Sequence, residues 1–147
     1  PVQVTRIIDA GVLTGWLLDS ASARQLGLTP TGHAARGTSG PPGVGATNLH
    51  LAAGSTSPAA LMADIKRGFY VTELIGMGVN GLTGDYSRGA SGFLIENGEI
   101  TVPVAEVTIA GNLIDMFKRM VAADDLSFRH ATNVPTVRID GMTIAGA

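Results

Sequence analysis

Apolar positions in the second half of the chain follow a pattern typical of β-strands. Residues 69–75 (FYVTELI) are rich in β-branched and aromatic side chains, which favour a strand. The segments FLIE and EITVPV flank Asn97-Gly98, a dipeptide that supplies the two positive φ angles of a type I′ turn. The sequence therefore predicts a β-hairpin around Asn97. Pro103 cannot donate a hydrogen bond to a neighbouring strand, so an edge position or a bulge is expected there.

Three other segments have the spacing and boundary residues of short helices, at 20–26, 58–67 and 113–122. Each starts beside a residue whose side chain can cap the first turn: Ser20, Ser57 and Asn112. Glycine follows the first two helices, as Gly27 and Gly68, where a left-handed C-terminal residue is common.

The remaining signals are for short strands and long glycine-rich connections. A hairpin is predicted over 2–18, a strand over 47–53, and a second hairpin at the Asp140-Gly141 turn, preceded by the strand-like segment LSFRH at 126–130. Residues 28–46 and 76–92 are predicted as loops or turns. EVTIAGN at 106–112 also resembles GMTIAGA at 141–147.

About eight strands against three helices predict an α+β fold that is mostly β. We expect a strongly twisted antiparallel sheet or a partly closed barrel, in a single domain spanning 1–147.

Composition excludes several function classes. The 147 residues include 10 Lys and Arg against 12 Asp and Glu, so no basic surplus exists to bind nucleic acid directly. No apolar run reaches the roughly 18 residues that a membrane-spanning helix needs, and no signal peptide is visible. With no cysteine, the chain has no disulfide, thiolate metal ligand or cysteine nucleophile.

Catalytic motifs are weak in this sequence. Residues 76–81 match G-x-G-x-x-G, but the glycines that follow prevent the helix that a dinucleotide site requires. His33, His50 and His130 have no second histidine or acid at metal-ligand spacing. Ser91 lies in GASG rather than G-x-S-x-G. We therefore predict no catalytic residue and no metal ligand in this chain.

Residues 69–112 combine bare glycine backbone, polar side chains and edge-strand features, as recognition of an extended peptide by strand addition requires. Asn80 and Arg88 are expected to hydrogen-bond the backbone of a substrate or partner. A turn held by an Asx bond and an ion pair is the alternative for the Asp85–Arg88 cluster. The candidate substrate- or partner-binding residues are Glu73, Gly76, Gly78, Asn80, Gly81, Thr83, Asp85, Tyr86 and Arg88.

The long segment GFYVTELIGMGVNGLTGDYSRGASGFLIENGEITVPVAEVTIAGNLIDM resembles the C-terminal part of PmbA/TldE proteins in the TldD/PmbA family. GVLTGWLLDSASARQLG, TGHAAR, TNLHL and the closing MTIAGA fit the same pattern, so the resemblance spans nearly the whole chain. It implies that these residues form the C-terminal domain of a longer protein.

The resemblance also implies a function. The family was named for modulation of DNA gyrase, and its members are understood as cytoplasmic metalloproteases acting on peptides or unfolded segments. The TldD member carries an HExxxH zinc motif upstream and a cysteine ligand in its C-terminal domain, whereas the TldE member pairs with it and lacks the metal site.

This sequence has neither HExxxH nor cysteine, so the resemblance implies the TldE-like subunit. It would have no cofactor of its own, with zinc in a TldD-like partner, and would act in a heterodimer or a homodimer on peptide substrates. Two alternatives stay open: a non-enzymatic scaffold for protein interactions, and a peptidase whose zinc ligands lie in an absent N-terminal part.

Overall fold

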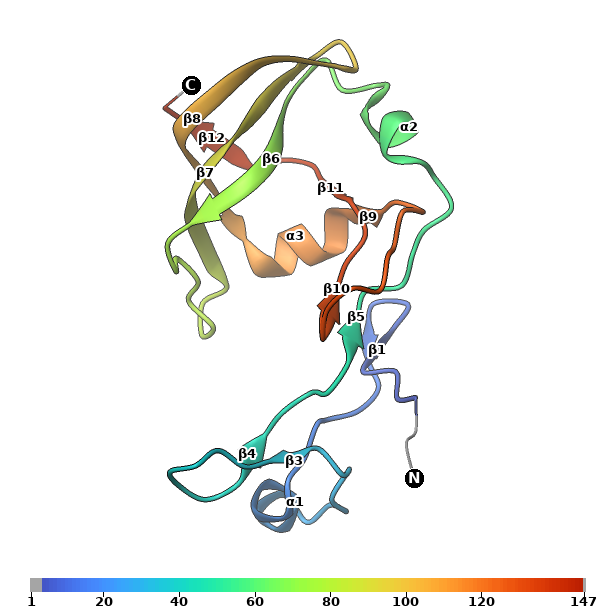
Figure 1. Ribbon diagram of the computed structural model, residues 1–147, viewed down its shortest axis with the longest axis vertical. Coiled ribbons are helices and arrows are strands. Elements are labelled where there is room, and N and C mark those ends of the chain that lie inside the picture. The colour runs from blue at the N-terminus through green and yellow to red at the C-terminus, as the bar shows by residue number, and fades with distance from the viewer. Residues whose placement is uncertain (1–3, 147) are drawn as a thin grey trace. The chain divides into compact units, whose positions relative to one another are not determined.

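The computed structural model describes residues 4–146, which group into two compact units (Figure 1). Among the described residues, unit 1 comprises 4–50 and 129–132, and unit 2 comprises 51–128 and 133–146. The elements of unit 1 are short: β1 (Ile8–Asp9), β2 (Val12–Leu13), α1 (Ser20–Leu26), β3 (Ala34–Ala35), β4 (Gly43–Val44) and β5 (Leu49–His50).

Unit 2 contains the long strands and two helices. In chain order these are α2 (Pro58–Met62), β6 (Arg67–Ile75), β7 (Asp85–Glu96), β8 (Glu99–Asn112), α3 (Leu113–Arg119), β9 (Met120–Ala122), β11 (Val137–Ile139) and β12 (Thr143–Ala145). The two-residue strand β10 (Thr132–Asn133) pairs with β5. No helix among residues 4–146 has the length and apolar character needed to cross a membrane.

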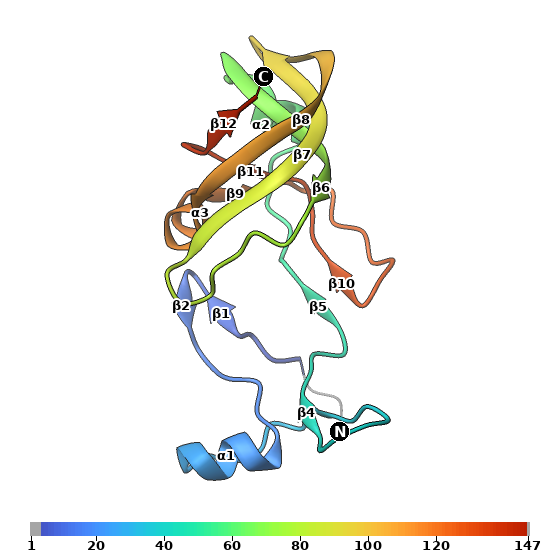
Figure 2. The same ribbon diagram turned by 90° about the vertical axis from the view of Figure 1, so that its left-hand side faces the viewer.

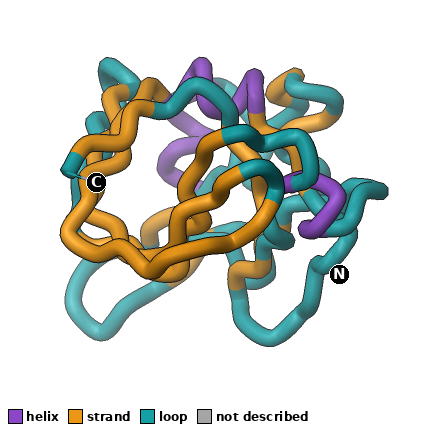
Figure 3. Tube along the Cα trace, turned by 90° about the horizontal axis from the view of Figure 1, so that it is seen from above, coloured by secondary structure: helices purple, strands orange, loops and turns teal. Residues whose placement is uncertain are grey.

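A four-stranded antiparallel sheet with the order β12-β8-β7-β6 is the centre of unit 2. Figure 2 shows its long strands β7 and β8 crossing unit 2 with a strong twist, and Figure 3 shows the strands bending into an arc. The bend accompanies register shifts between β6 and β7 and between β7 and β8, with the extra residues in β6 and β8, as expected of β-bulges. Strands β6 and β12 are the two outer edges, so the sheet does not close into a barrel.

These features confirm the α+β, mostly β prediction with a twisted antiparallel sheet. The Asn97-Gly98 hairpin is confirmed, with φ angles of 51° and 86° joining β7 to β8. Pro103 lies where β8 pairs with β7 alone, beside a register shift.

The core of unit 2 lies against one face of this sheet. Ala90, Val107 and Ile109 are buried, and the partly buried side chains around them are Phe69, Tyr86, Val104 and Met142. Ala90 is opposite Val107 in the register of β7 and β8, so both side chains lie on the same face. This inner face is also where Arg88 is placed, since it is opposite Ile109.

The twin segments noted in the sequence pair with each other. Ile144 of β12 is opposite Ile109 of β8, and Thr143 is opposite Ala110. The T-I-A triplet therefore meets its own copy in antiparallel register at this edge of the sheet.

Helix α2 ends at Met62, five residues before the predicted end. The backbone carbonyls of Ile65 and Lys66 instead accept hydrogen bonds from the amides of Gly98 and Asn97, at 2.8 and 3.0 Å. The turn of the β7–β8 hairpin thus competes with the helix for these carbonyls. Gly68 is part of β6 rather than a helix cap.

Other predicted boundaries also change. Residues 120–122 form β9 and pair with β11, so Asp140-Gly141 does not close a hairpin between β11 and β12. Helix α1 is capped by Asp19 rather than Ser20, with the Asp19 carboxylate accepting from the Ser22 amide at 2.7 Å.

In unit 1, the predicted hairpin is observed as β1 and β2, although its first predicted residue, Val2, lies outside the described residues. The predicted strand over 47–53 shortens to β5, and the predicted loop over 28–46 contains the paired strands β3 and β4. The strand predicted over 126–130 is not formed.

Candidate peptide- and partner-binding surface

All nine predicted binding residues lie in unit 2, on β6, β7 and the connection between them. Strand β6 carries Glu73, and β7 begins at Asp85, so the glycine-rich connection covers 76–84 rather than the predicted 76–92. Glycines 89 and 92 are strand residues. A Cβ at Gly92 would lie 1.9 Å from the carbonyl oxygen of Tyr70, so only glycine permits this close pairing of β6 and β7.

Asn80 makes hydrogen bonds that hold the 76–84 connection together. Its side-chain Oδ1 accepts hydrogen bonds from the amides of Leu82 and Thr83, at 2.9 and 3.3 Å. Its backbone amide donates to the Asp85 carbonyl at 2.8 Å, and its carbonyl accepts from Gly84 at 2.8 Å. Asn80 therefore forms an Asx turn of its own. The turn with an Asx bond that the sequence suggested for the Asp85–Arg88 cluster is not observed among residues 4–146, because residues 85–88 begin strand β7.

Thr83 and Asp85 continue this network at the start of β7. The Thr83 hydroxyl donates to the Asp85 carboxylate at 2.7 Å. Asp85 makes no ion pair with Arg88 in the part of the chain that the structure describes. Strand alternation explains this, because residues three apart on β7 project to opposite faces of the sheet.

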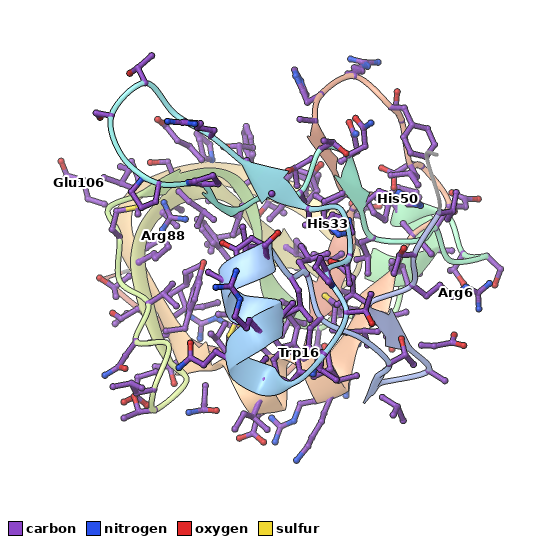
Figure 4. The ribbon with its side chains drawn as sticks, turned by 90° about the horizontal axis from the view of Figure 1, so that it is seen from below. Arg6, Trp16, His33, His50, Arg88 and Glu106 are labelled. Atoms are coloured by element: carbon purple, nitrogen blue, oxygen red, sulfur yellow. The ribbon has the colours of Figure 1, made fainter. Side chains whose placement is uncertain are left out.

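Arg88 keeps hydrogen-bond donors available on the inner face of the sheet. Figure 4 shows it inside the curve of the strands, with Glu106 on the outer side. One terminal nitrogen donates to the Leu74 carbonyl at 3.4 Å, and the buried Nε has no partner. A guanidinium carries five N–H donors, so this side chain can bind a further carbonyl or carboxylate.

Part of the glycine backbone in this connection packs against strand β7 of the same chain. A Cβ at Gly78 would lie 1.5 Å from the Ser87 carbonyl oxygen, and the Gly78 carbonyl accepts from the Ser87 amide at 2.7 Å. Gly76 and Gly81, in contrast, have open space where a Cβ would stand. Close approach by another chain is thus sterically available at these two positions.

Three residues of this surface were missed by sequence reasoning. Met77 and Leu82 are 97% and 98% exposed, in a connection that internal hydrogen bonds hold in place. Asn112 donates from Nδ2 to the Thr83 carbonyl at 3.0 Å and caps α3 through Oδ1. The sequence did contain a signal for the exposure of Met77 and Leu82. Both are large apolar residues in a glycine-rich loop, and such a loop has few apolar neighbours that could bury them.

A shallow hollow of about 300 Å³ lies beside α3. Its lining includes two acids and one base among glycine, amide and methionine side chains: Gly111, Asn112, Asp115, Met116, Arg119, Asp140, Gly141 and Met142. This mixture suits no single ligand class, and we assign it no role.

The donor set does not fit a catalytic zinc ion. Zinc in proteins is held by thiolate, imidazole and carboxylate ligands, usually three or four together. The chain has no cysteine, and among residues 4–146 no three His, Asp or Glu side chains gather to bind a metal. The His33 ring nitrogen Nδ1 lies 2.9 Å from the Thr31 hydroxyl.

Comparison with known proteins identifies the family. The model of the PmbA/TldA metallopeptidase C-terminal domain matches residues 1–146. The chain belongs to this metallopeptidase family. It is 46% identical over 141 residues to Metalloprotease PmbA of Escherichia coli O157:H7, covering 95% of this chain and 29% of that protein. The resemblance seen in the sequence is thereby confirmed.

Solved structures of the family share the fold. TldE from Thermococcus kodakarensis superposes with a TM-score of 0.84 at 26% identity, covering 95% of this chain and 33% of that one. A Bacteroides thetaiotaomicron protein described as a candidate modulator of DNA gyrase gives 0.78 at 32% identity, covering 96% and 30%. The chain therefore spans about a third or less of the length of these family members.

Proposed function

We propose that these residues form the C-terminal domain of a TldE-like subunit in a two-subunit cytoplasmic metalloprotease. In this proposal the domain contacts an extended peptide or unfolded segment, and the subunit that cuts it, through β6 and the 76–84 connection. It acts without a metal of its own.

The exposed edge of β6 carries this proposal. Strand β6 is nine residues long and, among the described residues, pairs with β7 alone. Its residues 71–75 are exposed, including Glu73. An unpaired edge of this length offers backbone groups to an added strand, as in β-augmentation.

Side chains beside the edge supply further contacts. Met77 and Leu82 offer apolar surface in the connection that follows β6, and the guanidinium of Arg88 lies on the inner face with its buried Nε unpartnered. Together they suit a ligand that is extended, has free backbone groups and carries some apolar side chains. A peptide or an unfolded protein segment has these properties.

Family membership and the lack of a zinc ligand set among the described residues support the proposal that a different subunit holds the zinc. The family is one of metallopeptidases, while the described residues of this chain offer no zinc ligand set. We therefore infer that zinc is held by a TldD-like subunit, with this chain shaping the path of the substrate.

The test uses the longer native chain mixed with its TldD-like subunit and an unfolded protein substrate. The double variant Met77→Ser and Leu82→Ser is expected to lower kcat/KM by at least about tenfold, as loss of an apolar contact of hot-spot size would. Val102→Ser, at an exposed apolar position of β8, is the matched control and is expected to cleave normally.

Unchanged cleavage and unchanged subunit pairing in the double variant would refute the proposed surface. Zinc content separates the remaining alternatives. About one zinc ion in the longer chain purified alone would make this chain part of a catalytic subunit. A scaffold without a peptidase role would pair with its partner equally well with and without added peptide.

A further inference from the structure

Unit 1 has very few buried residues. Among residues 4–50 and 129–132, only Leu18, Asp19 and Ala23 are buried. A segment of this size normally buries more than half of the surface that it exposes when unfolded. The internal contacts of unit 1 are therefore insufficient to explain its fold.

Large apolar side chains cover the outside of unit 1 instead. Ile8 is 64% exposed, and Trp16, the single tryptophan of the chain, is 58% exposed. Ile8 is opposite Leu13 in the β1–β2 hairpin, so these two exposed side chains lie on one face. The other exposed large apolar residues here are Val4, Val12, Leu26, Leu28, Val44 and Leu49. Apolar surface in this amount marks an interaction site.

The lengths of the relatives point to what covers unit 1. The chain corresponds to 29% of Metalloprotease PmbA and to 33% of TldE, and the matching family model describes a C-terminal domain. Some two thirds of such a protein therefore precede this domain. That segment would join the chain within unit 1, which makes its effective concentration there far higher than that of a separate molecule.

We propose that the exposed apolar surface of unit 1 docks on the segment that precedes this domain in the longer chain. The β1–β2 hairpin and Trp16 supply the apolar contacts, and unit 1 acquires its stable packing only when that segment is present. This inference goes beyond the proposed function and does not rest on a peptidase role.

Thiol labelling tests the proposal, since the 147 residues contain no cysteine. Ile8→Cys is introduced into the 147-residue chain and into the longer native chain, and the labelled peptide is followed by mass spectrometry. The introduced thiol is expected to react at least about tenfold more slowly in the longer chain. Val12→Cys, on the same hairpin, serves as a second reporter, and Val102→Cys on β8 is the control.

Three results would overturn the proposal. Equal labelling rates in both chains would show that the preceding segment does not cover unit 1. Protection that disappears on dilution would assign the surface to a second copy. Protection that requires an added metal-bearing subunit would assign it to that partner, in which case the proposed function could still hold.

A cross-linking measurement separates docking within one chain from docking between chains in a stable dimer. ¹⁵N-labelled and unlabelled longer chains are mixed, and a photoreactive group is attached to the thiol introduced by Ile8→Cys. Cross-links to the preceding segment are expected to join peptides of the same isotopic label. Cross-links that join different labels as often as the same label would contradict docking within one chain.

Discussion

In unit 2, Ala90, Val107 and Ile109 are buried on one face of the four-stranded sheet, and aromatic and aliphatic side chains pack around them. In unit 1, Ile8, Leu13 and Trp16 stay exposed although they are equally apolar. The difference follows from strand length. Strands of nine to fourteen residues create a continuous face that side chains can cover, whereas two-residue strands do not. Unit 2 thus contains its own hydrophobic core, whereas the apolar side chains of unit 1 remain on its surface.

The largest expected effect is the loss of a core side chain in unit 2. Ile109→Ala should lower the free energy of unfolding of the 147-residue chain by about 3 kcal/mol, because it leaves a cavity under β8. Urea denaturation measures this change. Ile100→Ala, at an exposed position of the same strand, is the control and should cost less than about 1 kcal/mol. Similar losses in both variants would mean that unit 2 has no specific core.

The second comparison concerns ion pairs. Arg138 of unit 2 is mostly buried, donates to the Leu61 carbonyl at 2.8 Å, and also binds the Asp64 and Asp140 carboxylates. Hydrogen bonds from a charged donor contribute about 1.5–3 kcal/mol, so Arg138→Met should cost about 2 kcal/mol. Arg6 of unit 1 pairs with Asp9 on the exposed surface, and Arg6→Met should cost less than about 0.5 kcal/mol.

Thermal unfolding of the two arginine variants checks this difference. Equal shifts in Tm would show that burial does not distinguish the two ion pairs.

Acid should destabilise unit 2 through carboxylates whose hydrogen bonds are stronger in the ionised form. The Thr136 hydroxyl and amide hold the pKa of Asp125 below its usual value, and hydrogen bonds from Arg138 do the same for Asp64. A lowered folded-state pKa gives stability that is present above the unfolded pKa near 3.9 and is lost as pH falls through the folded value.

The stability of the 147-residue chain should therefore fall below about pH 4, and Asp125→Asn should reduce that dependence. Unfolding free energies measured from pH 6 down to pH 2 provide the check. A variant with the full acid dependence of the wild type would show that Asp125 does not contribute.

The smallest effect is expected in unit 1. Trp16→Ala should change the stability of the 147-residue chain by less than about 0.5 kcal/mol, because the exposed indole has little packing to lose. The fluorescence of Trp16 should accordingly resemble that of tryptophan in water and be quenched readily by acrylamide. A blue-shifted, protected spectrum at low concentration would mean that unit 1 buries Trp16 by itself, which would remove the contrast between the units.

Local signals in the sequence predicted local structure well. The Asn97-Gly98 turn, the Ser57 and Asn112 caps, and the left-handed Gly27 are all confirmed. Each depends on backbone angles and hydrogen bonds within a few residues, which the residue types themselves restrict. The same reasoning placed all nine candidate residues in one region, because they are contiguous or nearly so along the chain.

Pairing between segments far apart in the chain decided the helix boundaries that the sequence did not predict. Whether Lys66 continues a helix depends on the hairpin turn about thirty residues later, and whether Met120 is helical depends on its pairing with Ile139. The role of Asn112 in holding Thr83 likewise requires the two segments to meet.

By itself, the sequence determined the α+β class, the Asn97-Gly98 turn, most of the caps and the family. Only the tertiary structure decided the strand order, the inward position of Arg88, and the exposure of Met77, Leu82 and Trp16. The physical reason is that propensity acts between neighbours in the chain, whereas burial and strand register depend on which distant segment competes for the same backbone groups and the same apolar surface.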